Sequence, residues 1–200
     1  MSEARPPLAV VLTGPSGVGK DSVFDRMVER GVPVARPATM TTRAPRPGEE
    51  EGVHHYFVTP DQFRANVAAG ELLEHAEVYG NLYGVPRKAV RAALGSGRDV
   101  VVRVDIQGAE TLHRLLPDAL FVCLTADGIE DLRARLLGRQ TESAEDIERR
   151  LSIAMAEIER ARGFCAIVVN RAGRLDETVD EILRLIEVER ARPGRTPLTL

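Results

Sequence analysis

Residues 14–22 read Gly14-Pro15-Ser16-Gly17-Val18-Gly19-Lys20-Asp21-Ser22, directly after the apolar run Leu8-Ala9-Val10-Val11-Leu12-Thr13. Glycines let a backbone curl so that successive N–H groups point at one anion, and the lysine adds a positive charge at that place. The spacing fits the phosphate-binding pattern G-x-x-x-x-G-K, and the flanks fit a buried strand before it and a helix after it, with apolar residues at Val23, Phe24, Met27 and Val28. We therefore predict a phosphate-binding loop.

The residue after the lysine departs from this pattern. A Ser or Thr is usual there, because its hydroxyl is a ligand for magnesium, whereas this chain has Asp21. The alternative interpretation of the segment is a glycine-rich turn that binds no ligand, and the missing hydroxyl is the best argument for it.

Composition and charge narrow the possible classes of protein. With 200 residues, 44% apolar and 28% charged, the chain fits one compact α/β domain with a small inserted lobe. A net charge of −3 gives no electrostatic reason to bind nucleic acid or an anionic membrane, so we expect small-molecule partners held by local basic clusters. The first residues resemble neither a signal peptide nor a membrane span, which predicts a cytoplasmic location.

The chain has two cysteines, Cys123 and Cys165, each within an apolar run. We predict buried thiols rather than a disulfide, and no zinc site, since no histidine cluster accompanies them.

Strand and helix patterns alternate along most of the chain, which predicts a parallel sheet with helices on both faces. The strand-like runs begin near residues 8, 99, 121 and 167, and the helical patterns cover residues 22–28, 107–116, 129–137 and 175–189. We assign the core to residues 8–34 and 98–190. A turn-rich lobe covers residues 35–97 and includes a short helix from Pro60 to Ala69, and a polar break marks a lid at residues 138–150. The tail, residues 191–200, has no periodicity and is expected to be disordered.

The inserted lobe carries a second basic segment. Residues 41–49 place Arg43 and Arg46 on a turn that prolines stiffen, which suits a grip on a second phosphate. A solvated basic turn is the alternative. Farther on, Glu74 and Tyr83 lie among apolar neighbours, and a half-buried acid there needs a partner.

Four motifs taken together resemble the guanylate kinase family, whose members pass the γ-phosphoryl group of ATP to GMP. They are Gly14-Pro15-Ser16-Gly17-Val18-Gly19-Lys20, Thr41-Thr42-Arg43-Ala44-Pro45-Arg46-Pro47-Gly48-Glu49, Glu74-His75-Ala76-Glu77-Val78-Tyr79-Gly80-Asn81-Leu82-Tyr83-Gly84 and Val104-Asp105-Ile106-Gln107-Gly108-Ala109. The likeness continues to Asn170, so it covers nearly the whole domain. It implies a P-loop NTPase fold with an inserted GMP-binding lobe and a short lid.

The resemblance also implies roles for individual residues. The loop residues 14–22 match the ATP site, with Asn170 beside the adenine and Arg135 in the lid region. Glu74 and Asp105 match the acids that select guanine, since adenine N1 is an acceptor where guanine N1 is a donor. The implied catalytic residues are Lys20, Arg43, Arg139 and Arg150, and the remaining implied GMP contacts are Thr39, Arg46, His55, Tyr83 and Val85. Mg²⁺, bound together with ATP, is the implied cofactor.

Four positions depart from the family pattern. They are Asp21, Arg103 where an acid is usual, His55 where a tyrosine holds the GMP phosphate, and Val85 where a Ser or Thr contacts guanine. Plastid-type guanylate kinases resemble this chain in the Lys-Asp pair and in the Arg-Val-Asp-Ile-Gln-Gly run, so we interpret the chain as a variant branch. Our hypothesis is that Asp21 supports magnesium, directly or through water, and that Arg103 faces Asp21 or the phosphates.

Two other functions remain possible from the sequence. Ribose bisphosphate phosphokinases resemble this chain in their Gly-Pro-Ser-Gly-x-Gly-Lys-Asp-Ser loop, although Glu74, Tyr83 and the Thr-Thr-Arg segment argue against that activity. A guanylate-kinase-like binding module without catalysis is the other alternative, and Lys20 argues against it.

Overall fold

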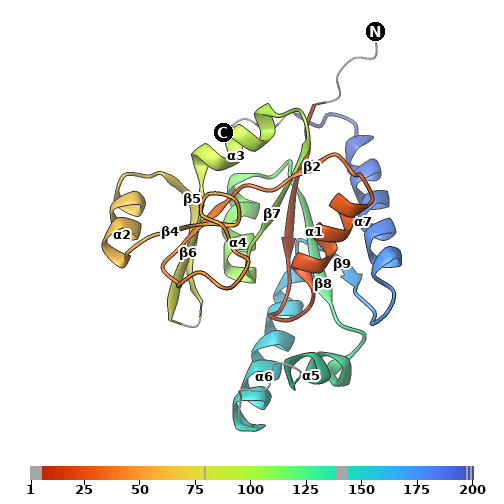
Figure 1. The fold of residues 1–200 in the computed structure, drawn as a ribbon. Coiled ribbons are helices and arrows are strands. Elements are labelled where there is room, and N and C mark those ends of the chain that lie inside the picture. The colour runs from red at the N-terminus through yellow and green to blue at the C-terminus, as the bar shows by residue number, and fades with distance from the viewer. Residues whose placement is uncertain (1–5, 79, 138–143, 197, 199) are drawn as a thin grey trace.

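The computed structural model of this protein describes residues 6–78, 80–137, 144–196, 198 and 200. Figure 1 shows a main body and a side lobe, each built on its own sheet. The elements run in the order β1 (Ala9–Thr13), α1 (Lys20–Glu29), β2 (Val34–Ala35), β3 (Thr39–Thr41), β4 (His55–Phe57), α2 (Pro60–Ala68), β5 (Leu72–Val78), β6 (Asn81–Pro86), α3 (Arg87–Gly95), β7 (Asp99–Arg103), α4 (Ile106–Leu115), β8 (Leu120–Thr125), α5 (Ile129–Leu137), α6 (Ala144–Ala161), β9 (Ala166–Val169) and α7 (Leu175–Arg190).

The main sheet is parallel throughout, in the order β2-β7-β1-β8-β9. Side chains alternate between the two faces of a strand, so central β1 contributes to two cores. Val10 and Leu12 pack with α1 and α7, which lie side by side on one face (Figure 1), whereas Ala9 and Val11 pack with α3 and α4 on the other. The predicted parallel sheet with helices on both faces is confirmed.

The side lobe is built on a mixed sheet in the order β4-β3-β6-β5. A small apolar core of Met40, Phe63 and Leu72 joins this sheet to α2. Thr59 caps α2 in a reciprocal capping box with Gln62, and the predicted short helix is confirmed as Pro60–Ala68. Neither this sheet nor α3 was predicted, because β3 and β4 have only three residues each and α3 buries only Val90.

Helices α5 and α6 pack against each other beyond the carboxyl ends of the main strands, at the bottom of Figure 1. Their shared core includes Leu132 and Leu136 from α5 and Ile147, Leu151 and Ala154 from α6. Of the predicted lid, residues 144–150 belong to α6, whereas residues 138–143, with Arg139, lie outside the described residues.

The residues after α7 make contacts that the sequence analysis did not expect. Arg192 donates to Asp118 Oδ1 at 2.8 Å, and Arg195 donates to the carbonyl of Pro7 at 2.9 Å. Leu198 and Leu200 pack against the apolar core that the main sheet forms with α3 and α4. Such apolar and ionic contacts reduce the freedom expected of an unstructured tail.

Both cysteines are free thiols, as predicted. Cys123 is fully buried on β8, and burial raises the pKa of its thiol to about 11. Cys165 is only half-buried, in correction of the prediction, because it precedes the edge strand β9. Among the described residues, no helix combines the length and apolar character needed to cross a bilayer.

Candidate active site

The loop between β1 and α1 needs glycine at two positions. Gly14 has φ 134°, and a Cβ there would overlap the carbonyl group of Leu124 on the neighbouring strand β8. Gly19 has φ 98° and forms the N-cap of α1, and a Cβ there would lie 2.5 Å from Asn170 Nδ2. Side chains rarely adopt these backbone angles, so the loop shape depends on glycine and leaves backbone N–H groups at the helix start.

Lys20 reaches back across this loop. Its Nζ donates to the carbonyl oxygens of Gly14 at 2.6 Å and Pro15 at 3.2 Å. Burial of the ammonium group lowers the pKa of Lys20 to about 8, and the negative charge of Glu157 partly opposes that shift. The ammonium group is thus held at the loop, where a phosphate would meet it.

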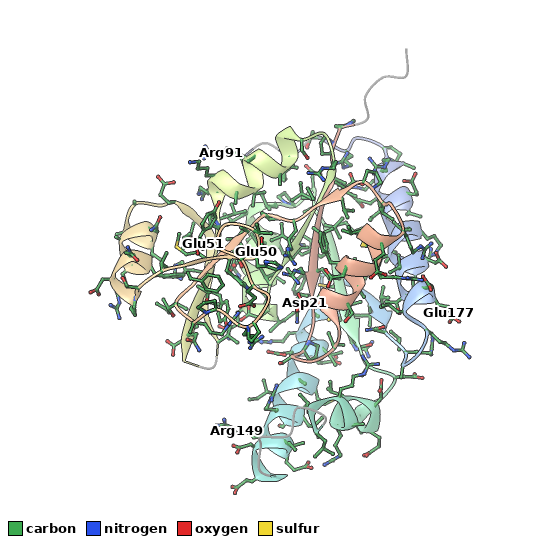
Figure 2. The ribbon with its side chains drawn as sticks, in the orientation of Figure 1. Asp21, Glu50, Glu51, Arg91, Arg149 and Glu177 are labelled. Carbon is green, nitrogen blue, oxygen red and sulfur yellow. The ribbon has the colours of Figure 1, made fainter. Side chains whose placement is uncertain are left out.

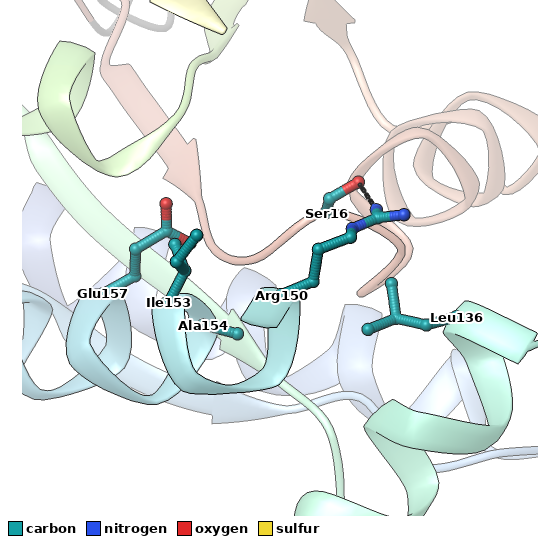
Figure 3. A pocket seen from close by; sticks show the side chains of 6 residues that line it. All are labelled: Ser16, Leu136, Arg150, Ile153, Ala154 and Glu157. Carbon is teal, nitrogen blue, oxygen red and sulfur yellow. Dashed lines mark hydrogen bonds between the residues drawn. The ribbon is translucent and has the colours of Figure 1, made fainter. Parts of the chain in front are cut away.

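Three distant segments brace the loop at the positions predicted for ATP binding. Asn170, which follows β9, donates through Nδ2 to the carbonyl of Val18 at 2.8 Å, and Arg135 on α5 donates to the same carbonyl at 3.2 Å. Arg150 on α6 donates to Ser16 Oγ at 3.0 Å (Figure 3). Arg135 also pairs with Asp131 at 2.8 Å. The structure therefore brings Arg135, Arg150 and Asn170 together around the loop.

Figure 3 shows a small pocket between the loop and α6. Its lining residues are Ser16, Leu136, Arg150, Ile153, Ala154 and Glu157. Burial raises the pKa of Glu157, and the positive charge of Lys20 partly opposes that shift. Glu157 was not among the predicted site residues; the available signal was its place two helical turns after Arg150, on the same face of α6.

Asp21 and Arg103 form an ion pair. Asp21 lies at the amino end of α1 (Figure 2) with 78% of its side chain exposed, whereas Arg103 ends β7 with 14% exposed. Burial lowers the pKa of Arg103 to about 10. The prediction that Arg103 faces Asp21 is confirmed. The two departures from the family pattern, at positions 21 and 103, are therefore in contact with each other.

A second cluster gathers residues predicted to hold the GMP phosphate. Arg43 donates to both carboxylate oxygens of Glu49, at 2.8 and 3.0 Å, and through Nε to the hydroxyl of Tyr83 at 3.2 Å. A 2.7 Å hydrogen bond joins Thr39 Oγ1 to His55 Nδ1.

Glu49 completes this cluster, although the sequence analysis gave it no role. Its Oε2 accepts from the backbone N–H of Arg46 at 2.7 Å, while the Arg46 residue is exposed. The sequence feature that could have indicated this role is an acidic residue three positions after Arg46 in a proline-rich turn. Glu49 thus neutralises Arg43 and stabilises the turn that carries both arginines.

Glu74 is a buried carboxyl group, with 5% of the residue exposed and no hydrogen-bond partner for Oε2 among the described residues. A Cβ on Gly108 would lie only 2.7 Å from that oxygen, so glycine at position 108 leaves room for the carboxyl. Burial and the nearby charge of Asp105 raise the pKa of Glu74 to about 8. Native proteins seldom leave such a group without a partner outside a functional site.

Asp105 and Val85 have local structural roles near Glu74. Asp105 is the N-cap of α4, and its Oδ1 accepts from the N–H of Gly108 at 2.7 Å. Val85 pairs with Glu74 across the β5–β6 ladder. The residue is only 1% exposed, and it packs in the apolar core between the main sheet, α3 and α4. The structure therefore assigns the Val85 isopropyl group to packing.

The raised pKa of Glu74 predicts a pH-dependent stability. A carboxyl that holds its proton more tightly when folded stabilises the fold fully below its unfolded pKa, near 4.3, and this contribution is lost as the pH rises through about 8. The free energy of unfolding of the wild type should therefore fall more between pH 5 and pH 9 than that of Glu74→Gln. Urea denaturation at both pH values measures the difference, and parallel profiles would contradict it.

Comparison with known proteins agrees with this geometry. The sequence model of the family "Guanylate kinase" matches residues 7–189. A "Guanylate kinase" of Thermobifida fusca is 43% identical over 91% of this chain and 92% of its own length. "Guanylate kinase 2, chloroplastic/mitochondrial" of Oryza sativa is 41% identical over 93% of this chain and 66% of its own length.

A solved structure agrees as well. The crystal structure of guanylate kinase from Anaplasma phagocytophilum superposes with a TM-score of 0.77 and 29% identity, covering 96% of this chain and 90% of its own. The chain thus shares sequence and fold with these proteins over nearly its whole length, and it belongs to the guanylate kinase family.

Proposed function

We propose that this protein transfers the γ-phosphoryl group of ATP to GMP, with dGMP as a further acceptor, to give ADP and GDP or dGDP. The observation that carries the proposal is the buried Glu74 carboxyl, whose Oε2 has no hydrogen-bond partner in the described part of the chain and whose pKa the nearby charge of Asp105 helps to raise. Guanine offers N1–H and an amino group to such acceptors, whereas adenine offers a lone pair at N1. Membership of the family supports the same activity. The basic side chains of Lys20 at the loop and of Arg43 in the lobe support it as well.

The proposed chemistry needs positioning and electrostatics rather than a covalent intermediate. Lys20 and the loop N–H groups bind the ATP phosphates, while Arg43, Arg46, His55 and Tyr83 orient the GMP phosphate. Arg150, with Arg139 as a prediction from the resemblance, stabilises charge on the transferring group. Closure of the lobe over both nucleotides excludes water.

The residues present fit a magnesium ion carried with ATP. No group of three or more His, Cys, Asp or Glu side chains in the described part of the chain could hold a metal by itself. Asp21, exposed next to the loop, offers a hard carboxylate that complements phosphate oxygens and water in the coordination that Mg²⁺ prefers. When bound, Mg²⁺ neutralises negative charge on the ATP phosphates.

The ion pair predicts that Asp21 and Arg103 act together. Asp21→Ser leaves the Arg103 charge without its carboxylate, and Arg103→Asp leaves two acids at one place, so each single variant should weaken magnesium-dependent ATP binding. The double variant should depart from additivity by about 0.5–3 kcal/mol, as contacting residues do. Calorimetric titration with ATP at several magnesium concentrations measures the ATP affinity of the wild type, the two single variants and the double variant. Strict additivity would count against coupling.

A nucleotide panel tests the proposed activity. ADP release should be detected with GMP and dGMP, and at far lower rates with AMP, UMP and CMP. Equal rates with AMP would exclude the proposal. Phosphorylation of a ribose bisphosphate instead would favour the first alternative, and GMP binding without ATP binding would favour the non-catalytic module.

The remaining predictions concern the cellular setting. A cytoplasmic location, a part in purine nucleotide metabolism and the absence of nucleic-acid partners stay predictions from the sequence. One relative carries a chloroplastic/mitochondrial name.

A further inference from the structure

His55 stands at the centre of the cluster around Arg43 and Glu49. Its Nδ1 is bonded to Thr39 Oγ1 at 2.7 Å, and its Nε2 lies 3.8 Å from Glu49 Oε1. The ring packs edge-on against Phe57 and Tyr83, with centroids 5.6 and 6.4 Å away, and 15% of the side chain is exposed. These contacts fix the orientation of the ring, so each nitrogen has a defined neighbour.

A neutral imidazole carries one N–H and one lone pair, so its two nitrogens cannot both donate a hydrogen bond. If Nδ1 carries the proton, it donates to Thr39, and Nε2 presents a lone pair toward Glu49 and any incoming phosphate. If Nε2 carries the proton, Nδ1 accepts the only proton of the Thr39 hydroxyl, which then has none for a ligand. Only the imidazolium lets Nε2 donate to an anion while the Thr39 hydroxyl stays free to donate.

The charges around His55 favour a change of protonation on ligand binding. The facing groups are Glu49 and Arg43 from the β3–β4 connection, Arg36 ahead of β3, neighbouring His54, and Tyr83 from β6. Burial lowers the pKa of His55, while Glu49 and Arg43 compensate each other as an ion pair. A phosphate dianion adds negative charge at this place and favours the charged ring.

Resting on the proposed function, we propose that His55 takes up a proton when GMP binds, and that the imidazolium positions the acceptor phosphate between Nε2 and Arg43. The family's tyrosine at this position offers a hydroxyl donor that does not titrate near neutral pH. The substitution therefore makes acceptor binding by this chain proton-linked. Above the pKa of free His55, GMP affinity contributed by this residue falls by up to about tenfold for each unit of pH.

Calorimetry with GMP, in buffers of different ionisation enthalpy, measures the protons exchanged. Glu74 and the GMP phosphate also titrate, so the readout is the difference between the wild type and His55→Gln, which keeps a nitrogen donor but cannot be charged. We expect the wild type to take up more protons than the variant at pH 7.5, by a difference that approaches one. His75→Gln, on an exposed residue of β5, is the matched control and should exchange as many protons as the wild type.

A second measurement uses the unmodified protein. Nitrogen chemical shifts of the ring should change from a neutral tautomer to the doubly protonated form of His55 when GMP is added, and the His55→Gln spectrum identifies the signal among the four histidines. A neutral ring in the GMP complex, or equal proton exchange in both proteins, would overturn the inference while phosphoryl transfer to GMP still stands. Absence of GMP binding by the wild type would overturn the proposed function and the inference together.

Discussion

Replacing Lys20 with Met should reduce turnover by about 10³-fold or more while GMP affinity stays close to that of the wild type. The ammonium group lies 2.6 Å from the Gly14 carbonyl, within the loop proposed for the ATP phosphates. Methionine keeps much of the length of the side chain but supplies no charge or donor. Loss of one group that stabilises transition-state charge typically costs about 10²–10³ in rate, and phosphoryl transfer depends strongly on such groups.

Lys88 offers a matched control for this variant, since it is the only other lysine in the chain. It is exposed on α3, so Lys88→Met should keep both rate and affinity. Coupled ADP release gives the rate, and calorimetry with GMP gives the affinity. Turnover within tenfold of the wild type in Lys20→Met would remove Lys20 from the catalytic residues.

The second large effect concerns the choice of base. Glu74→Gln should lower kcat/KM for GMP by about 10²–10³-fold and leave the low rate with AMP nearly unchanged. A site built to accept hydrogen bonds discriminates strongly when its buried acceptor meets the wrong group, and the amide turns one acceptor of Glu74 into a donor facing guanine donors. The ratio of kcat/KM for GMP to that for AMP measures the effect.

Glu77→Gln is the appropriate comparison, because Glu77 lies on the same strand β5 but is exposed. It should leave the GMP-to-AMP ratio at its wild-type value. An unchanged ratio in Glu74→Gln would show that the guanine assignment of Glu74 is wrong, even if the enzyme remains a nucleotide kinase.

The parts of the fold that could be predicted are those with strong local patterns. The apolar run before Gly14 predicted β1, and the spacing of Val179, Ile182 and Ile186 predicted α7, because both elements bury a continuous apolar face. The lobe sheet was missed because β3 and β4 have three residues each. β4 pairs with β3, and β3 in turn pairs with β6, which lies far along the chain, so no local pattern predicts this sheet.

The candidate site also has parts that a local sequence pattern predicts and parts that depend on contacts with other side chains. The loop of residues 14–22 was predictable, since its glycines and lysine act through adjacent backbone groups. The roles of Glu49 and Glu157 were not, because Glu49 acts by pairing with Arg43 and Glu157 acts through the electrostatic interaction of its carboxyl group with Lys20. Glu49 closes the 41–49 motif without a role that its spacing could reveal, and Glu157 lies outside all four motifs.

The order of residues alone therefore determined the glycine-rich loop, the alternating core and the identity of the groups that we propose to bind nucleotides. Only the tertiary structure decided their charge states and partners: Glu74 and Lys20 both have a pKa near 8, and Asp21 lies paired with Arg103. The physical reason is that sequence spacing specifies which groups are present and which backbone turns are possible. Burial and the distances between charges arise only when segments far apart in the chain pack together.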